Sequence, residues 1–216
     1  MSLGSRIAAF YRGDGIGRVL MNEAIARTVV LHGLAVDIGG KGAPSYGPLL
    51  QRAADCRFVV LDLIPHETVD VVGSVTQLPL RSDGCDVALC FNVLEHVSDY
   101  ASALAELRRV LKPGSVLYGR VPFLVGIHGD PHDYWRFTPE TLVRALKRAG
   151  FAEVTLETHG GLFLVVANLM WPLFRLGVLR AVGGGLALLL DRLFTAVVGV
   201  ARNRERFPLG YYFSAR

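Results

Sequence analysis

The stretch AVDIGGKGAP, residues 35–44, joins a short apolar run to a glycine-rich turn. Ala35–Ile38 reads as a buried strand, and Asp37, Gly39 and Gly40 stand where that strand gives way to a turn. The glycines match neither the G-x-G-x-x-G dinucleotide fingerprint nor a P-loop ending in G-K-[ST]. The stretch therefore predicts a strand-to-helix ligand turn of an α/β fold without a recognisable phosphate-binding signature.

Strand-like runs alternate with helical stretches on both sides of this turn. That rhythm favours one parallel sheet covered by helices on both faces. The predicted strands are Ala35–Ile38, Arg57–Leu63, Val71–Gly73, Val87–Asn92, Val116–Val121, Glu153–Thr158 and Leu209–Ser214. With 216 residues we expect a single domain over residues 1–216.

Two helices are legible from their ends. One is predicted over Asp99–Leu111 with Ser98 as its N-cap, because leucines recur on one face and K-P-G follows. Thr138 followed by Pro139 predicts the start of another, which Gly150 ends. The opening residues, Met1–Arg12, carry no functional weight in this interpretation.

An apolar insertion interrupts the rhythm before the last strand. Residues 162–201 are 70% apolar, against 51% for the whole chain, and the insertion extends to about residue 205. Its longest run without Asp, Glu, Lys or Arg, Thr158–Phe174, has 17 residues, whereas a membrane span needs about 20. We therefore expect helices that lie on a membrane surface or bind a lipid-like acceptor; packing on the sheet or closing a homodimer is the alternative.

Polar residues follow several predicted strands. Asp37, Asp62 and Asn92 occupy such positions, and ligands of open α/β sheets bind beyond the carboxyl ends of the strands. An acid at the end of the second strand is well placed to accept hydrogen bonds from ribose hydroxyls, although an ordinary turn acid is an equal alternative for Asp62. An acidic turn suits an ammonium group and would repel a pyrophosphate, which disfavours a nicotinamide dinucleotide.

Later motifs are more specific. They read GSVTQLPL (73–80), SDGCDVALC (82–90), CFNVLEHV (90–97), LRRVLKPGS (107–115) and VPFLVGIHGDPHDYWRFTPETL (121–142). With them, the run from Asp37 to Phe151 resembles a class I S-adenosylmethionine-dependent methyltransferase of the type 11 methyltransferase-domain family, of the small kind found among glycan and secondary-metabolite genes. The resemblance implies a Rossmann-like fold, with a seven-stranded, mostly parallel sheet whose last strand is antiparallel.

The resemblance also implies S-adenosylmethionine as cofactor and S-adenosylhomocysteine as product. Lys41 and Ala43 replace two glycines of the family's turn, and Ser74 replaces an acid that usually contacts the adenine amine. Gly40 and Gly42 still allow a close backbone approach. The expected cofactor-binding residues are Asp37, Gly39, Gly40, Asp62, Leu63, Ser74, Val75, Asn92 and His96.

Histidines supply candidates for the reaction. Transfer to a hydroxyl needs an aligned acceptor and a proton acceptor, and histidine has a suitable unperturbed pKa. We expect His128 or His132 to act as base, with Asp130 and Asp133 orienting an imidazole or holding a sugar hydroxyl. His96, in LEHV, is expected to shape the cofactor side.

The same loop contains metal-ligand residue types and aromatic residues that could pack it. His128, Asp130, His132 and Asp133 are ligand types, but their spacing matches no local metal signature, so no metal is predicted. The run of Tyr134, Trp135 and Arg136 either packs the loop and pairs with a buried acid, or forms a sugar platform and phosphate clamp.

Composition bounds the partners and location. A net charge of +4 without an aromatic-interleaved basic stripe predicts no nucleic-acid partner. Three cysteines without C-x-x-C spacing and no cleavable signal pattern predict a cytoplasmic protein, peripheral at the inner face of the membrane if the insertion binds lipid. We expect methyl transfer to a hydroxyl of a saccharide, lipid-linked glycan or related metabolite; the alternative is a catalytically silent membrane-surface or binding module.

Overall fold

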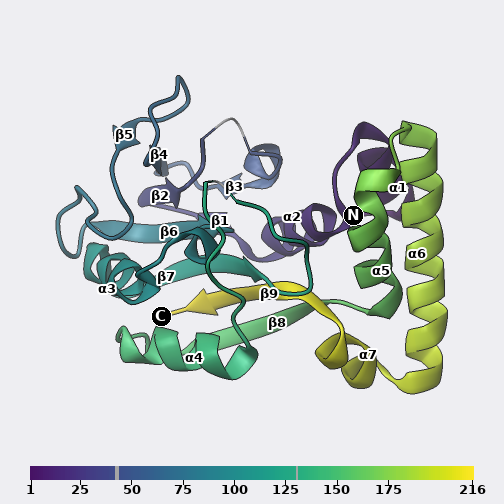
Figure 1. Cartoon of the computed structure of the whole chain (residues 1–216). Coiled ribbons are helices and arrows are strands. Elements are labelled where there is room, and N and C mark those ends of the chain that lie inside the picture. Colours follow the sequence, from purple (N-terminus) through teal and green to yellow (C-terminus); the bar gives the residue numbers. More distant parts are fainter. Residues whose placement is uncertain (42–43, 130) are drawn as a thin grey trace. The chain divides into compact units, whose positions relative to one another are not determined.

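A computed structural model describes residues 1–41, 44–129 and 131–216. The expectations about Gly42, Ala43 and Asp130 therefore lie outside the described residues. Seven strands form one sheet in the order β5-β4-β2-β6-β7-β9-β8, flanked by helices (Figure 1). The strands are β2 (Leu34–Ile38), β4 (Arg57–Asp62), β5 (Val71–Val72), β6 (Cys85–Phe91), β7 (Leu111–Pro122), β8 (Val154–Gly160) and β9 (Pro208–Ala215). Two further strands, β1 (Val30–Leu31) and β3 (Gln51–Arg52), pair separately.

The sheet is mostly parallel, as the sequence predicts. Strand β2 pairs in parallel with both β4 and β6, and β6 pairs in parallel with β7. Glu153 and Arg216 donate their N–H groups to each other's carbonyl oxygens, at 3.1 and 2.9 Å, which is the pattern of an antiparallel pair. The last strand, β9, therefore runs antiparallel to its neighbour β8, and the expected fold class is confirmed.

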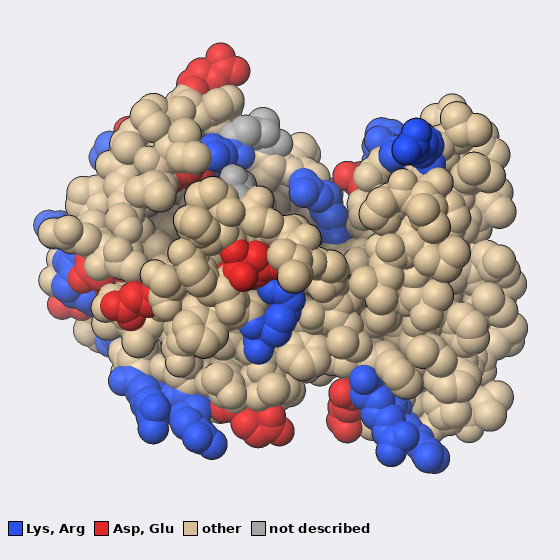
Figure 2. All heavy atoms as spheres, in the orientation of Figure 1, with Lys and Arg blue, Asp and Glu red and all other residues tan. Residues whose placement is uncertain are grey.

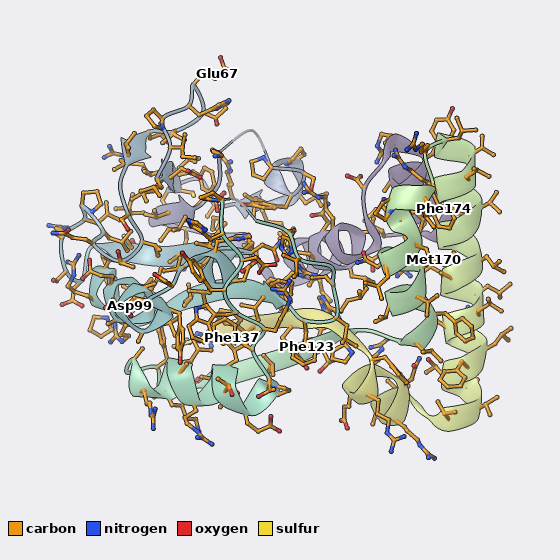
Figure 3. All side chains as sticks on the ribbon, in the orientation of Figure 1. Glu67, Asp99, Phe123, Phe137, Met170 and Phe174 are labelled. Carbon is orange, nitrogen blue, oxygen red and sulfur yellow. The ribbon has the colours of Figure 1, made fainter. Side chains whose placement is uncertain are left out.

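All seven predicted strands are present, with shifted ends. The largest shift is in β7, which begins at Leu111 because helix α3 (Tyr100–Val110) already ends there. The N-cap of α3 is Asp99 and not the predicted Ser98: its Oδ1 accepts from Ser102 N at 3.0 Å and its Oδ2 from Ser102 Oγ at 2.6 Å. Asp99, labelled in Figure 3, thus caps the helix with both carboxylate oxygens.

Helix α4 (Pro139–Arg148) begins and ends as predicted. Thr138 caps it by accepting from Thr141 N, and Gly150 follows with φ +101°. Leu142, Ala145 and Leu146 are buried on its inner face, and α4 packs against α3.

Helix α3 also fixes the loop that follows β5. Arg109 donates to the carbonyl oxygens of Leu78 and Leu80, at 3.0 and 2.9 Å, while Glu106 Oε2 accepts from Leu78 N at 2.7 Å. Glu106 and Arg109 form an ion pair at 2.6 Å. The LRRVLKPGS motif therefore carries the side chain that holds the GSVTQLPL loop at the sheet edge.

The chain divides into two compact units. The first comprises Met1–Ala24, Pro122–Ile127 and Thr158–Tyr211; the second comprises Ile25–Val121, His128–Glu157 and Tyr212–Arg216. A compact unit need not fold on its own, so this division does not test the prediction of a single domain over residues 1–216. The remaining helices are α1 (Leu3–Arg12), α2 (Ile16–Thr28), α5 (Leu162–Met170), α6 (Gly177–Val198) and α7 (Val200–Arg206), with short turns η1 (Gly47–Leu49), η2 (Leu94–His96) and η3 (Trp171–Leu173).

The apolar insertion forms helices within the first unit, as expected. Helix α6 lies along α1 and α5 (Figure 1), and Phe10 of α1 packs so closely on Gly184 that a Cβ there would collide with its ring. The N-terminal segment, given no weight from sequence, is thus part of this helical core. Asn203, fully buried, joins the helices: it donates to Asp191 Oδ1 at 3.1 Å and accepts from Leu162 N at 2.9 Å.

The outer side of α6 is apolar and exposed. Its exposed residues recur every three or four positions, which places them on one helix face: Val178, Val182, Leu186, Leu189, Leu193 and Val197. Figure 3 shows side chains along α6 pointing away from α1 and α5. By length and composition alone, α6 is long and apolar enough to cross a membrane. Of its most apolar 18-residue stretch, 17% is buried within the protein.

Other apolar residues of the insertion face the core of the first unit, although composition alone does not distinguish them from those on the exposed side. Leu164 is buried, and Trp171 and Leu188 pack against the same core. Trp171 meets Phe10 edge-on, with ring centroids 5.5 Å apart. These three side chains therefore stabilise the helical core.

Candidate cofactor and acceptor site

Four of the predicted site residues share one edge of the sheet. In the register of the parallel strands Ile38 is opposite both Leu61 and Cys90, and Asp62 is opposite Val72. Asp37, Asp62, Ser74 and Asn92 therefore stand at or just beyond the carboxyl ends of neighbouring strands, where open α/β sheets bind ligands.

The glycine turn after β2 has no room for side chains. Gly39 has φ +77°, and a Cβ there would lie 2.6 Å from Val93 Cγ2. A Cβ on Gly40 would collide with the carboxylate of Asp37. Only glycine fits either position, so the turn keeps a close backbone approach.

Asp37 is held within this turn by a residue that sequence reasoning missed. Its carboxylate is fully buried, and the hydroxyl of Tyr46 donates to Oδ1 and Oδ2 at 3.0 and 2.9 Å. Desolvation by burial raises the pKa of Asp37 to about 7, although the Tyr46 hydrogen bond acts in the opposite direction. The sequence signal for Tyr46 is its place in the apolar turn following the glycines.

The residues after β4 and β5 form two tight turns. Asp62 is buried, and its Oδ1 accepts from Ile64 N at 3.0 Å, while the side chain of Leu63 is exposed. Ser74 Oγ lies 2.8 Å from Thr76 Oγ1, and Val75 is buried beside it. These turns leave an acid, a hydroxyl and an exposed apolar side chain along the edge.

Asn92 has a strained backbone at the end of β6. Its φ is +55°, a conformation that few residues other than glycine adopt, although asparagine tolerates it. Its Oδ1 accepts a hydrogen bond from the guanidinium of Arg120, which is 5% exposed. Arg120 was missed from sequence; its signal is a single charge inside the apolar strand VLYGRVPF.

Beyond β6, the structure groups three residues of the LEH and loop motifs. His96 Nε2 lies 3.8 Å from Glu95 Oε1, and His128 Nε2 lies 3.9 Å from the same oxygen. The two imidazole rings meet edge to face, with centroids 5.3 Å apart. Glu95 was missed from sequence, while His96, expected on the cofactor side, lies directly beside His128.

Asp133 orients His128 from the other side. Its Oδ2 accepts from His128 N at 2.9 Å and lies 3.5 Å from His128 Nδ1. Arg136 donates to both carboxylate oxygens, at 2.7 Å for Oδ2. Chiefly this hydrogen bonding lowers the pKa of Asp133 well below its ordinary value, so Asp133 is an anionic orienting group.

His132 contributes differently from His128. Its backbone carbonyl accepts from His96 Nδ1, while its exposed ring packs on Tyr134 with centroids 5.3 Å apart. Of the two histidines expected as base, His128 is the one held by Asp133 and placed beside Glu95.

The next three residues largely pack the loop. Trp135 Nε1 donates to Val97 O at 2.9 Å, and its ring meets Tyr100 edge-on. Arg136 pairs with the nearly buried Asp133. These contacts match the structural alternative for Trp135 and Arg136; Tyr134 keeps an exposed ring.

Residues 15–119 match a protein-family model described as a methyltransferase domain. A structure of an S-adenosylmethionine-dependent methyltransferase from Mesorhizobium loti aligns over 94% of this chain and all of that chain, with a TM-score of 0.59 and 17% identity. The fold is that of a class I methyltransferase. The phosphoethanolamine N-methyltransferase 2 of Haemonchus contortus, in complex with phosphomonomethylethanolamine and S-adenosylhomocysteine, has a TM-score of 0.55 and 14% identity, over 90% of this chain and 52% of that chain.

A curated relative adds little about activity. An uncharacterized 37.1 kDa protein in a Streptomyces fradiae transposon is 50% identical over 46 residues, which span 21% of this chain and 13% of that protein. The domain match and the similar structures together support S-adenosylmethionine as the cofactor of this methyltransferase fold. They name no acceptor for this chain.

Proposed function

We propose that this protein transfers a methyl group from S-adenosylmethionine to a hydroxyl of a saccharide, a lipid-linked glycan or a related metabolite. The observation that carries the proposal is a carboxylate-oriented imidazole, His128, just beyond the sheet edge that bears the glycine turn. Glu95 and His96 lie beside it. An acceptor hydroxyl needs such a proton acceptor, whereas a binding module has no use for one.

The glycine turn fits the cofactor. Gly39 and Gly40 cannot carry side chains, so backbone lines the turn, and the carboxyl group of Asp37 lies beneath it. Asp62 is the candidate for the ribose hydroxyls, and Leu63, Ser74, Val75 and Asn92 are candidates for the adenine end. When bound, the cofactor supplies an activated methyl group on a sulfonium.

The chain's own residues then align the acceptor and remove its proton. His128 would accept the hydroxyl proton while the acceptor oxygen takes the methyl carbon from the sulfonium sulfur, so that the carbon–sulfur bond breaks and S-adenosylhomocysteine is left. Asp133 lies 3.5 Å from Nδ1, and its negative charge favours the tautomer with the proton on Nδ1 and the lone pair on Nε2. His132 and Tyr134 present exposed rings in the same loop, and such a surface suits the apolar face of a sugar.

We further propose that the outer face of α6 rests on an anionic membrane surface, which would bring a lipid-linked acceptor to the enzyme. The exposed leucines and valines of α6 form one apolar stripe. Arg175, Arg192, Arg202, Arg204 and Arg206 are exposed in the same unit. Figure 2 shows this unit largely free of charge on the face turned to the viewer, with basic side chains gathered at its ends. That combination is typical of interfacial helices, and it supports a peripheral location on the cytoplasmic leaflet.

Calorimetric titration with S-adenosylmethionine and S-adenosylhomocysteine tests the core of the proposal. We expect saturable binding of both, followed by transfer of isotope-labelled methyl groups to a lipid-linked saccharide fraction. Absence of binding at millimolar cofactor would leave the silent binding module as the explanation. Binding without transfer to any hydroxyl acceptor would retain the cofactor site and remove the acceptor class.

A further inference from the structure

Glu95 is a fully buried carboxylate whose oxygens have no hydrogen-bond partner among the described residues. Its backbone carbonyl accepts from Tyr134 N at 2.7 Å and from Trp135 N at 3.3 Å, so the loop is tied down beside it. A buried, unbonded carboxylate is costly, which indicates that something else completes this site.

Two imidazoles direct their Nε2 atoms at this carboxylate. The Nε2 atoms of His96 and His128 lie 3.8 and 3.9 Å from Glu95 Oε1. These separations exceed hydrogen-bond length, so neither ring hydrogen-bonds to the carboxylate. The ligand atoms offered by the three residues all lie within 4.8 Å of one another.

The far side of each ring is already used. His96 Nδ1 donates to the carbonyl oxygen of His132, and His128 Nδ1 faces Asp133. The hydrogen bond fixes the tautomer of His96 that has its lone pair on Nε2, and the negative charge of Asp133 favours the same tautomer of His128. A backbone carbonyl and a carboxylate behind the ring are the usual supports of metal-bound histidines.

We propose that Glu95, His96 and His128 bind a divalent transition-metal ion through Oε1, Nε2 and Nε2. Two imidazoles and one carboxylate suit Zn²⁺ or Fe²⁺ and leave coordination positions open. Bonds of about 2.0 to 2.2 Å would place tetrahedral ligand atoms roughly 3.4 Å apart. The two separations from Glu95 Oε1, 3.8 and 3.9 Å, are close to that value, whereas the two Nε2 atoms, which lie within 4.8 Å of each other, need to approach by up to about 1.4 Å. The side chain of His128 is 46% exposed and lies in a loop, which permits that movement.

The neighbouring charge is consistent with a cation here. Arg136 is the nearby guanidinium, and it donates to Asp133 and to Trp135 O. Asp133 is the hydrogen-bonded partner of Arg136, whereas Glu95 interacts with Arg136 only electrostatically and more weakly. Both carboxylate oxygens of Glu95 therefore keep lone pairs for a metal ion. The sequence does not reveal these three candidate ligands as one group, because Glu95 and His96 come from the turn after β6 and His128 comes from the loop after β7.

The role of the ion, which rests on the proposed methyl transfer, is to activate the acceptor. A bound divalent ion lowers the pKa of a coordinated hydroxyl, which helps its proton to leave. With the ion bound, His128 is a ligand and the hydroxyl proton passes to solvent water; the proton-acceptor role proposed for His128 belongs to the metal-free protein. Metal binding itself can be measured without cofactor or acceptor.

The test uses untagged, full-length protein that has been stripped with a chelator and then titrated with Co²⁺. We expect visible absorption bands of a Co²⁺–protein complex that saturate at one equivalent and disappear when Zn²⁺ is added. Glu95→Gln and His128→Ala should each weaken Co²⁺ binding at least tenfold, and Asp133→Asn should weaken it less. His66→Ala, which removes an exposed histidine bonded to Thr68, should leave it unchanged.

Three results would overturn the proposal. They are no saturable Co²⁺ binding by the parent protein, Co²⁺ binding by Glu95→Gln and His128→Ala as tight as that of the parent protein, or a loss in His66→Ala as large as in these two variants. Circular dichroism of each variant separates lost ligands from lost folding, and Glu95→Gln preserves the side-chain shape. Titration of the stripped protein with S-adenosylhomocysteine is an independent readout. Cofactor binding without metal binding rejects only this inference, whereas metal binding without cofactor binding rejects only the proposed function.

Discussion

The Nδ1 atom of His128 lies 3.5 Å from Oδ2 of Asp133, and the backbone N–H of the same histidine donates to that oxygen at 2.9 Å. One carboxylate oxygen thus accepts a hydrogen bond from the main chain of His128 and lies beside its ring. Because Arg136 keeps this carboxylate anionic, the orientation of His128 persists over the whole neutral pH range. This pair is therefore the first target for testing the proposed role of the loop after β7.

His128→Ala is expected to lower methyl transfer about 10²- to 10⁴-fold, the usual loss when a general base is removed. Cofactor affinity should stay within about twofold of the parent protein, because His128 is not among the residues assigned to the cofactor. Single-turnover transfer and calorimetry measure the two quantities separately. His132→Ala is the matched comparison; if it alone abolishes transfer, His132 and not His128 is the required histidine.

Asp62→Ala should weaken S-adenosylhomocysteine binding by about 1 to 3 kcal/mol, because ribose hydroxyls lose a buried acceptor. The control is Glu67→Ala in the loop that follows the same strand; Glu67 is exposed, and Figure 3 shows it at the outer tip. Calorimetry at one ionic strength measures both variants. Equal affinity of Asp62→Ala and the parent protein would remove the ribose assignment.

Asp37 should make stability depend on pH. Its pKa is raised by burial from 3.8 to about 7, so between these values the folded state keeps a proton that the unfolded state has released. Stability therefore falls as pH rises through this window, and the penalty is complete above about pH 7. Asp37→Asn should gain stability progressively over the same range, up to about 4 kcal/mol.

Urea unfolding of both proteins from pH 4 to 8 measures this difference. Tyr46→Phe provides a second check, because it removes the hydroxyl that lowers the Asp37 pKa and should shift the window to higher pH. A difference between Asp37→Asn and the parent protein that does not change with pH would show that Asp37 titrates normally.

The α6 stripe predicts binding to anionic vesicles. A variant with Leu186→Gln, Leu189→Gln and Leu193→Gln should lose roughly tenfold or more of that binding, because three exposed apolar side chains no longer enter the acyl boundary. The control carries Leu3→Gln, Val30→Gln and Val72→Gln, which change comparably exposed residues outside α6. Co-sedimentation with phosphatidylserine vesicles measures the effect.

Sedimentation velocity completes that experiment. If the parent protein ignores vesicles and forms a dimer that the α6 variant cannot form, the stripe is a dimer interface and the membrane proposal fails. Equal vesicle binding by the α6 and control variants contradicts it as well.

The sequence by itself determined the seven strands of the main sheet and the helices α3 and α4, because their signals are local, whereas α1, α2, β1 and β3 were not predicted. Alternation of apolar residues located all seven strands of the sheet, and Thr138 with Pro139 located the start of α4. The strand ends at Asp37 and Asp62 follow from the same local pattern, since parallel strands bring their carboxyl ends to one edge. The N-cap of α3 was harder to predict, because Ser98 and Asp99 are both residue types that favour this position. The hydrogen bond from Ser102 N to Asp99 shows that Asp99 is the cap.

Only the tertiary structure decided which distant residues meet. Tyr46 reaches Asp37, Arg120 reaches Asn92, and Glu95 faces His128, in each case through packing that no spacing rule encodes. Likewise, composition marks the insertion as apolar but does not say which leucines are inside. Burial depends on where each helix face lies: Leu164 is in the core, while Leu186 and Leu189 remain exposed, because only packing against α1 and α5 removes a helix face from water.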